Sequence, residues 1–123
     1  MNRSRFNALL LAATVLPLGL ALPAQAEEWP SKPIRWVVPF PPGGAMDAIA
    51  RALGEKASKT LGQPVVIENK PGAGGNIGAD FVAKSAPDGH TLLLATVGLA
   101  TNKFLYAKLS YDPVKDFAPV SLL

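Results

Sequence analysis

The stretch Ile34-Arg-Trp-Val-Val-Pro-Phe-Pro-Pro-Gly-Gly-Ala45 decides the fold, because a strand pattern, a turn and a helix start follow one another within it. Residues 34–40 are apolar and β-rich, which predicts a buried strand. Pro33 precedes this segment and Pro39 lies inside it, and prolines are restricted to the ends of a strand or to an edge strand. Pro41-Pro42-Gly43-Gly44 predicts a turn.

A helix pattern follows this turn from Ala45 to Leu61, where apolar residues recur every three or four positions. Arg51, Glu55 and other charged residues lie off the apolar face, and Gly62 stands where a helix-ending glycine belongs. The residues predicted to face the core are Met46, Ile49, Ala50, Leu53, Ala57 and Leu61.

The same alternation continues along the chain. Residues 64–68 and 91–96 have strand patterns, and residues 77–85 can form a short helix after the glycine-rich loop 69–76. The inner side of this helix is predicted to carry Ile77, Phe81 and Val82 or the stem of Lys84. Residues 106–123 are predicted to be mostly irregular. The order β-α-β-α-β predicts an α/β fold with a parallel-rich sheet, buried on both faces and flanked by helices.

Residues 1–26 have the features of a secretory signal peptide. Arg3 and Arg5 precede an apolar run, 8–22, and Ala24-Gln25-Ala26 forms a cleavage site. The run of about 15 residues is shorter than the ~20 that a membrane-spanning helix needs. We therefore expect export, a mature chain that begins near Glu27, and one domain from residues 27–123.

The end of the chain predicts a truncated protein. Residues 117–123 look like the start of another strand, and no polar cap follows them. We interpret residues 27–123 as the N-terminal part of a larger binding domain.

Composition argues against several classes of function. The chain has 12 Lys+Arg and 9 Asp+Glu, and removal of Arg3 and Arg5 leaves 10 basic and 9 acidic residues, a net charge of +1. Such a balance gives no reason to expect a nucleic-acid partner. Without cysteine there is no disulfide or thiolate chemistry. His90, the only histidine, is expected at the surface, and no metal cluster or catalytic motif is present. We predict no enzyme, catalytic residue, metal or cofactor.

Three segments follow the predicted strands and should meet at the carboxyl edge of the sheet: Pro41–Asp47, Asn69–Asn76 and Thr96–Asn102. The first two lead into helix N-termini, whose free N–H groups and partial positive charge attract anions. The glycines of the first segment let a ligand approach the backbone. This edge is therefore predicted to bind a carboxylate, sulfate or phosphate.

Individual residues at this edge have alternative interpretations. Asp47 either caps N–H groups and favours the helix dipole, or accepts a hydrogen bond from a ligand or ordered water. Thr96, Thr101 and Asn102 either donate to a ligand carboxylate or are solvated loop residues. The glycine loop lacks dinucleotide spacing, since Ile77 stands where G-x-G-x-x-G needs glycine, so a tight turn is the favoured interpretation.

Six motifs together carry a resemblance to a known family. They are Trp29-Pro-Ser-Lys-Pro-Ile-Arg35, Val37-Val-Pro-Phe-Pro-Pro-Gly-Gly44, Leu61-Gly-Gln-Pro-Val-Val66, Asn69-Lys-Pro-Gly-Ala-Gly-Gly-Asn-Ile-Gly78, Ala86-Pro-Asp-Gly-His-Thr-Leu-Leu93 and Tyr111-Asp-Pro-Val-Lys-Asp-Phe117. In this order they resemble the substrate receptors of tripartite tricarboxylate transporters, also called Bug receptors. The resemblance covers essentially all of the mature chain.

The resemblance implies a periplasmic binding protein-like (type II) fold whose two lobes close on a small carboxylate, here with the second lobe missing. It implies a monomer that passes its ligand to a membrane permease and is not an enzyme. Backbone groups and waters around the first strand–helix loop hold the ligand in this family. Carried over, the ligand-binding residues are Phe40, Pro41, Pro42, Gly43, Gly44 and Asp47, joined by Thr96, Gly98, Thr101 and Asn102 from the loop after the third strand.

Two departures from the family pattern affect this site. Met46 stands where Thr or Ser is frequent, and Val97 stands where a small polar residue is frequent, so both remove hydrogen-bonding capacity. A truncated chain without binding activity and a nucleotide-binding α/β enzyme are the alternatives to a receptor.

Overall fold

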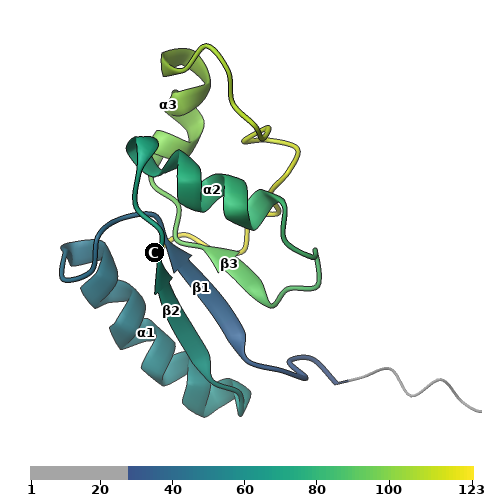
Figure 1. Ribbon diagram of the computed structural model, residues 1–123. Coiled ribbons are helices and arrows are strands. Elements are labelled where there is room, and N and C mark those ends of the chain that lie inside the picture. The colour runs from purple at the N-terminus through teal and green to yellow at the C-terminus, as the bar shows by residue number, and fades with distance from the viewer. Residues whose placement is uncertain (1–27) are drawn as a thin grey trace, which may run out of the picture.

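A parallel sheet with the strand order β2-β1-β3 lies at the centre of the computed structural model, which describes residues 28–123 (Figure 1). The predicted signal peptide, residues 1–26, lies outside the described residues. The elements in chain order are β1 (Ile34–Val38), α1 (Ala45–Leu61), β2 (Val65–Asn69), the 3-10 turn η1 (Ala73–Gly75), α2 (Asn76–Ala83), β3 (Thr91–Leu93) and α3 (Val97–Leu105).

Strand β1 is the central strand, and Pro33 and Pro39 lie just outside its two ends, which is the first of the two positions predicted for these prolines. Ile34 pairs with Val65 and Val38 with Asn69 on one side, and Val37 pairs with Leu93 on the other. The strand ends at Val38, two residues earlier than predicted, because Pro39 has no N–H to give to a ladder. β3 also ends early, at Leu93 instead of residue 96.

The core lies between the sheet and α1. Val38, Ala50 and Leu94 are buried, and four partly buried side chains pack against them: Trp36, Phe40, Met46 and Ile67. α1 has the predicted bounds and ends at Gly62, whose left-handed backbone (φ 69°) closes the last turn. Ile49, predicted to face inward, is 43% exposed, and Asp47 and Gly54 are buried instead.

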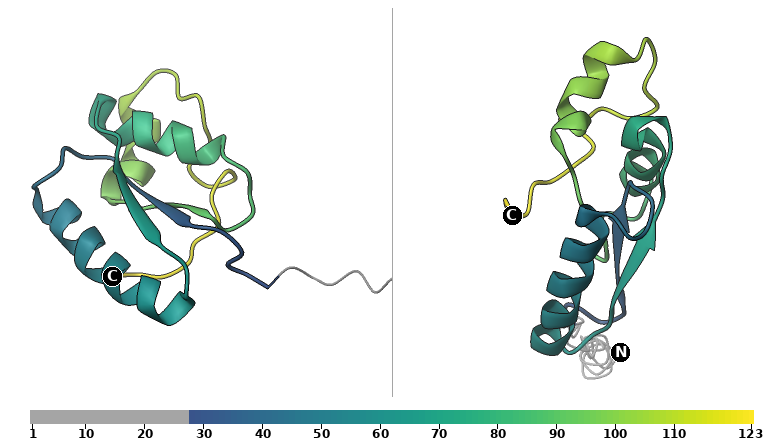
Figure 2. Two further views of the ribbon diagram at one scale, coloured as in Figure 1. Left: turned by 60° about the horizontal axis from the view of Figure 1, so that its bottom comes forward. Right: turned by 90° about the vertical axis from the view of Figure 1, so that its left-hand side faces the viewer.

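Helices α1 and α2 cover opposite faces of the sheet (Figure 2, right). On the α2 side, the Arg35 guanidinium and the Lys70 ammonium lie 4.8 Å and 4.1 Å from the centre of the Phe81 ring. α2 buries Gly78 and Ala79, whereas Ile77, predicted to face inward, is 54% exposed. Only β1 is largely buried, so the prediction of near-continuous strands buried on both faces fails for β2 and β3.

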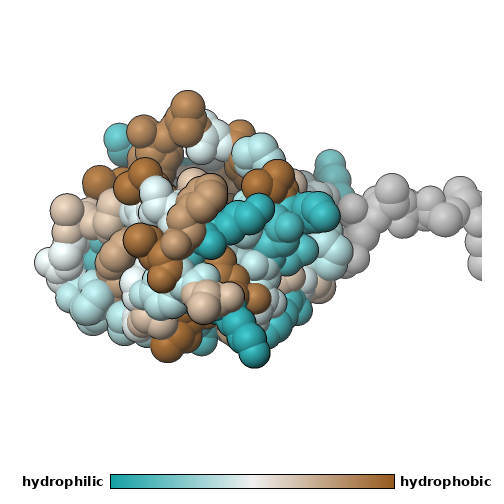
Figure 3. Space-filling model, turned by 90° about the horizontal axis from the view of Figure 1, so that it is seen from above, coloured by the Kyte–Doolittle hydropathy of each residue, from teal (hydrophilic) through white to brown (hydrophobic). Residues whose placement is uncertain are grey.

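Helix α3 occupies a segment that we predicted as a loop. Thr96 caps it, since its Oγ1 accepts a hydrogen bond from the Gly98 N–H at 3.3 Å. Several apolar side chains of α3 face solvent, including Phe104 at 85% exposure, and hydrophobic residues appear on this end of the molecule when it is viewed from above (Figure 3).

Residues 106–123 contain no regular helix or strand, as predicted for the segment as a whole. The strand expected to begin at residues 117–123 is not formed. Across residues 28–123, no helix combines the length and the apolar character needed to cross a membrane.

Candidate functional site

The three segments predicted to meet at the carboxyl edge of the sheet do so. The Lys70 N–H donates to the Val38 carbonyl at 2.9 Å, which joins the ends of β1 and β2. The Asn102 side-chain amide donates to the Gly74 carbonyl at 3.1 Å, which joins α3 to the glycine loop. We refer to residues 39–44 as the first junction and residues 70–75 as the second junction.

The first junction presents bare backbone to solvent. Residues 41–44 are all exposed, and Gly43 has φ +87°, a conformation that favours glycine. A Cβ placed on Gly43 would meet no atom of the described chain within 4 Å, and one on Gly44 would meet only the Pro41 carbonyl oxygen at 3.9 Å. A ligand can therefore approach this backbone closely.

Helix α1 begins directly after this loop. Gly44 is its N-cap, and no side chain caps it there. The first hydrogen bond runs from the Ala48 N–H to the Gly44 carbonyl at 3.0 Å. The N–H groups of Ala45, Met46 and Asp47 precede this hydrogen bond, so they have no partner inside the helix. Met46 itself turns toward the core, so its side chain does not line this edge.

The Asp47 carboxylate is buried below the loop and fully engaged there. Its Oδ2 accepts hydrogen bonds from the Gly43 N–H at 3.0 Å and from Arg51 Nε at 2.9 Å. Its Oδ1 accepts one from Asn69 Nδ2 at 3.0 Å. These donors, with Arg51 first and Gly43 next, hold the pKa of Asp47 well below its usual range. Asp47 thus lies in the first turn of α1, where its charge favours the helix dipole, but the N–H group that it caps belongs to Gly43, just before the helix.

Arg51 and Asn69 are two residues of this cluster that the sequence analysis did not single out. Arg51 lies four residues after Asp47 on the helix, a spacing typical of ion pairs that could have identified it. Asn69 is the last residue of β2, and its side chain also donates to the Phe40 carbonyl at 3.1 Å. No sequence signal relates Asn69 to Asp47, because their contact depends on how β2 pairs with β1.

The second junction is closed by packing. Gly72, Gly74 and Gly75 all have positive φ angles. A Cβ on Gly72 would lie 2.5 Å from Ile77 Cδ1, and one on Gly74 would lie 2.9 Å from the Tyr106 hydroxyl oxygen. These distances confirm the interpretation of this loop as a tight strand-to-helix turn.

The residues predicted after the third strand lie at the correct edge but bond within the protein. Thr96 caps α3 through Gly98, and the Thr101 hydroxyl donates to the Val97 carbonyl at 3.2 Å. Asn102 is buried and donates to Gly74 and, at 2.7 Å, to Asn76 Oδ1. Beside them is a hollow of about 10 Å³, which is room for about one water molecule.

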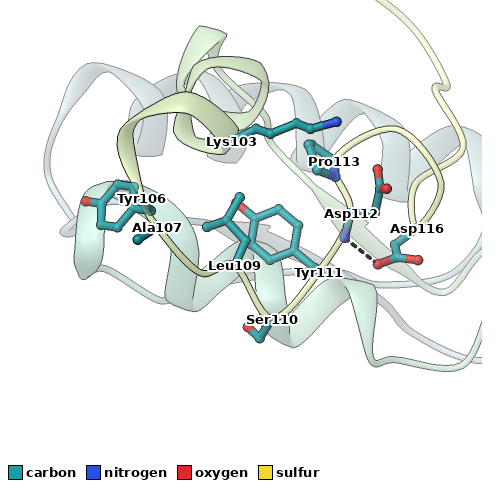
Figure 4. Close-up of a pocket in the computed structure, with 9 residues that line it drawn as sticks. All are labelled: Lys103, Tyr106, Ala107, Leu109, Ser110, Tyr111, Asp112, Pro113 and Asp116. Carbon is teal, nitrogen blue, oxygen red and sulfur yellow. Dashed lines mark hydrogen bonds between the residues drawn. The ribbon is translucent and has the colours of Figure 1, made fainter.

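A larger, open hollow of about 450 Å³ lies between the end of α3 and the irregular segment (Figure 4). Lys103, Tyr106, Tyr111 and Asp112 contribute to its lining, and the Asp112 N–H donates to Asp116 Oδ2 at 2.6 Å. None of the predicted ligand-binding residues lines this hollow.

His90 is buried, so the predicted surface position is wrong. Its Nδ1 lies 3.0 Å from the Asp88 carbonyl oxygen, and its ring packs against Trp29 with centroids 5.8 Å apart. It precedes β3, at the end of the strand opposite to the candidate site. Residues 28–123 contain no group of three or more His, Asp or Glu side chains arranged to hold a metal ion.

Known proteins are similar to this chain over most of its described length. The family model "Tripartite tricarboxylate transporter family receptor" matches residues 49–123. A UPF0065 protein in the tcbD-tcbE intergenic region of Pseudomonas sp. strain P51 is 52% identical over 96 residues, which are 78% of this chain and 29% of that protein.

Solved structures show the same fold. The periplasmic binding protein BugD is 46% identical with a TM-score of 0.71, over 74% of this chain and 30% of that one. MatC from Rhodopseudomonas palustris with bound malate is 50% identical with a TM-score of 0.67, over 76% of this chain and 32% of that one. The fold is therefore part of a periplasmic binding protein, and the chain spans about a third of the length of these relatives. The chain belongs to the receptor family of the tripartite tricarboxylate transporters.

Proposed function

We propose that this protein is a periplasmic receptor that captures a small carboxylate and delivers it to the membrane permease of a tripartite tricarboxylate transporter. Residues 1–26 act as its export signal, and residues 27–123 form the N-terminal part of its binding domain. The observation that carries the proposal is the open backbone of the first junction at the start of α1. Membership of a receptor family and the malate bound by MatC support it.

The ligand carboxylate is held by main-chain N–H groups. Gly43 already gives its N–H to Asp47, so the donors are the N–H groups of Gly44, Ala45 and Met46. The partial positive charge of the helix N-terminus adds to their attraction for an anion. Pro41 and Pro42 stiffen the loop, and the absence of side chains on the glycines leaves room for the ligand.

The acidic side chain nearest this site does not repel the ligand, because Arg51 neutralises it. Arg51 Nε lies 2.9 Å from Asp47 Oδ2. Thr96 and Gly98 lie at the start of α3 and contact the ligand, in this proposal, through a water molecule. The small hollow that Thr96 lines has room for about one water.

Thermal-shift screening of the full-length gene product tests the proposal. Malate, citrate, glutamate or benzoate should raise the unfolding temperature, because a ligand that binds only the folded state stabilises it by RT ln(1 + [L]/Kd). NAD and ATP serve as controls and should cause no shift. A shift with a nucleotide alone would contradict a receptor and favour the nucleotide-binding enzyme, and no shift with any compound would favour a chain without binding activity.

Gly44→Val tests the site itself. Gly44 has an ordinary extended backbone (φ −84°, ψ 174°) and open space around it, so valine should leave the fold intact while it covers the helix start. We expect carboxylate binding to be lost with an unfolding temperature close to that of wild type. Gly43→Val should also abolish binding, but φ +87° adds backbone strain, so Gly44→Val is the cleaner variant.

A further inference from the structure

Three polar side chains lie beneath the first junction and are joined to one another: Asp47, Arg51 and Asn69. Asn69 Nδ2 lies 3.0 Å from Asp47 Oδ1, and Arg51 lies 2.9 Å from Asp47 Oδ2 through Nε and 3.4 Å from Asn69 Oδ1 through its terminal nitrogen. We call this group the polar brace. It connects the first turn of α1 to the last residue of β2.

The polar brace holds both ends of the exposed loop. Asn69 donates to the Phe40 carbonyl at 3.1 Å, where the loop begins. Asp47 accepts from the Gly43 N–H at 3.0 Å, where the loop ends. One side-chain hydrogen bond between Asn69 and Asp47 therefore links two backbone groups on either side of Pro41 and Pro42.

Packing contributes little to the shape of this loop. Residues 41–44 are exposed, and no described atom lies within 4 Å of a Cβ built on Gly43. Glycine also has the largest backbone freedom to lose on folding. The loop thus depends on hydrogen bonds to the polar brace for a single conformation.

We propose that Asn69 and Asp47 are positioning residues of the carboxylate site, which hold the loop open and the N–H groups at the start of α1 in a binding-ready arrangement. The proposal rests on the function proposed above. Neither residue contacts the ligand, because the Asp47 oxygens and the Asn69 amide are directed to Gly43, Arg51, Phe40 and each other. A site ordered before the ligand arrives binds more tightly, since less ordering entropy is lost on binding.

Asn69→Ala tests this role against a matched control, Ser58→Ala. Ser58 links the same helix and strand at their opposite ends, where its hydroxyl donates to the Gly54 carbonyl at 2.9 Å and accepts from the Val65 N–H at 2.8 Å. Each variant removes one side chain that joins α1 to the β2 region. We expect both to lose a similar amount of thermal stability, because each breaks a comparable set of hydrogen bonds.

Binding should separate the two variants. The probe is malate, or whichever of citrate, glutamate and benzoate binds wild type more tightly, and calorimetry well below the unfolding temperature measures Kd. Asn69→Ala should weaken binding about tenfold or more, whereas Ser58→Ala should stay within about twofold of wild type. Equal Kd values for the two variants would overturn the positioning role and leave the receptor proposal standing. Absence of binding by wild type would overturn both.

Hydrogen exchange at the Gly43 amide gives a readout that needs no ligand. The amide should exchange faster in Asn69→Ala, because the Asp47 carboxylate that accepts its hydrogen bond is displaced. Asp47→Ala, which removes this acceptor, should have the same effect and serves as the second variant if Asn69→Ala folds poorly. Asp47→Asn keeps an oxygen for this amide and should restore part of the protection. Unchanged exchange in folded Asn69→Ala and Asp47→Ala would show that the polar brace does not hold the loop.

Discussion

The two strand-to-helix junctions have similar glycine-rich sequences but opposite environments. At the first junction, a Cβ on Gly43 would meet no described atom within 4 Å. At the second, a Cβ on Gly72 or Gly74 would come within 3.0 Å of a neighbouring side chain. The first junction is held by the charged polar brace below it, and the second by neutral groups, with Asn102 donating to Gly74 and Asn76.

This contrast shows that a glycine-rich loop at a helix start is not by itself a ligand site. The second junction uses its glycines to let elements pack closely, so its backbone is covered. The first junction leaves its backbone accessible and places its supporting contacts beneath the loop. Accessibility of the N–H groups, more than glycine content, distinguishes a candidate anion site from a packing turn.

The largest effect is expected where the two junctions touch. A Cβ on Gly78 would lie 2.9 Å from Pro39 Cβ and 3.1 Å from the Lys70 carbonyl oxygen. Gly78→Val should therefore lower the free energy of unfolding by about 3 kcal/mol, which urea denaturation measures. Gly44→Ala, at the open junction, is the control and should be nearly neutral. Similar urea midpoints for Gly78→Val and Gly44→Ala would contradict the view that the second junction is closed by packing and the first is open.

The next effect concerns the neutral support of the second junction. Asn102→Ala removes the donor to the Gly74 carbonyl and to Asn76 Oδ1, and Asn76 Oδ1 then accepts from the Tyr111 hydroxyl, 2.7 Å away. We expect a loss of about 2 kcal/mol in the free energy of unfolding, because buried polar groups lose a partner. If stability is unchanged and only carboxylate binding falls, Asn102 serves the ligand directly and the sequence-based prediction for it holds.

A smaller effect is expected at Gly43. Its φ of +87° is unfavourable for other residues, but the space around it is open. Gly43→Ala should cost about 1 kcal/mol of folding stability, from backbone strain alone. Thermal unfolding of this variant beside Gly44→Ala isolates that strain, since Gly44 has an ordinary φ of −84°. A loss as large as that of Gly78→Val would mean that the first junction is also closely packed.

The smallest effect distinguishes the charged support from the neutral one. The pKa of Asp47 is held well below its usual range, mainly by Arg51. In the unfolded state Asp47 takes up a proton near pH 4, whereas in the folded state it remains ionised there. The stabilisation of the folded state by the Asp47 carboxylate is therefore complete above about pH 4 and is lost as the pH falls further. Wild type should lose stability more steeply than Asp47→Asn between pH 6 and pH 3 in urea denaturation. Stability profiles that run parallel for wild type and Asp47→Asn would contradict a charged Asp47 in the polar brace.

Local signals explain which parts of the fold were predictable. The bounds of α1 and its end at Gly62 follow from periodicity and a cap residue within the helix itself. Helix α3 was missed because apolar side chains such as Val97 and Phe104 face solvent, so no inward apolar face marks it. Ile49 and Ile77 were placed inward because they are apolar, whereas the close contacts are made by Gly54 and Gly78.

The site was predictable in location but not in detail. Strand order along the chain was enough to bring residues 41–47 and 69–76 to one edge. The contacts of Asn69 with Asp47 and of Asn102 with Gly74 join segments that lie 22 and 28 positions apart, and they depend on sheet register and helix placement. His90 was misplaced for the same reason, since the Trp29 ring covers it from a distant part of the sequence.

A crystal structure of the full-length gene product with its tightest-binding carboxylate tests the central claim most directly. We predict that a ligand carboxylate oxygen lies within hydrogen-bond distance of the N–H groups of Gly44, Ala45 or Met46, with Asn69 and Asp47 bonded to the loop as they are here. A ligand bound at the second junction or in the hollow beside Tyr106, with the first junction empty, would contradict the claim.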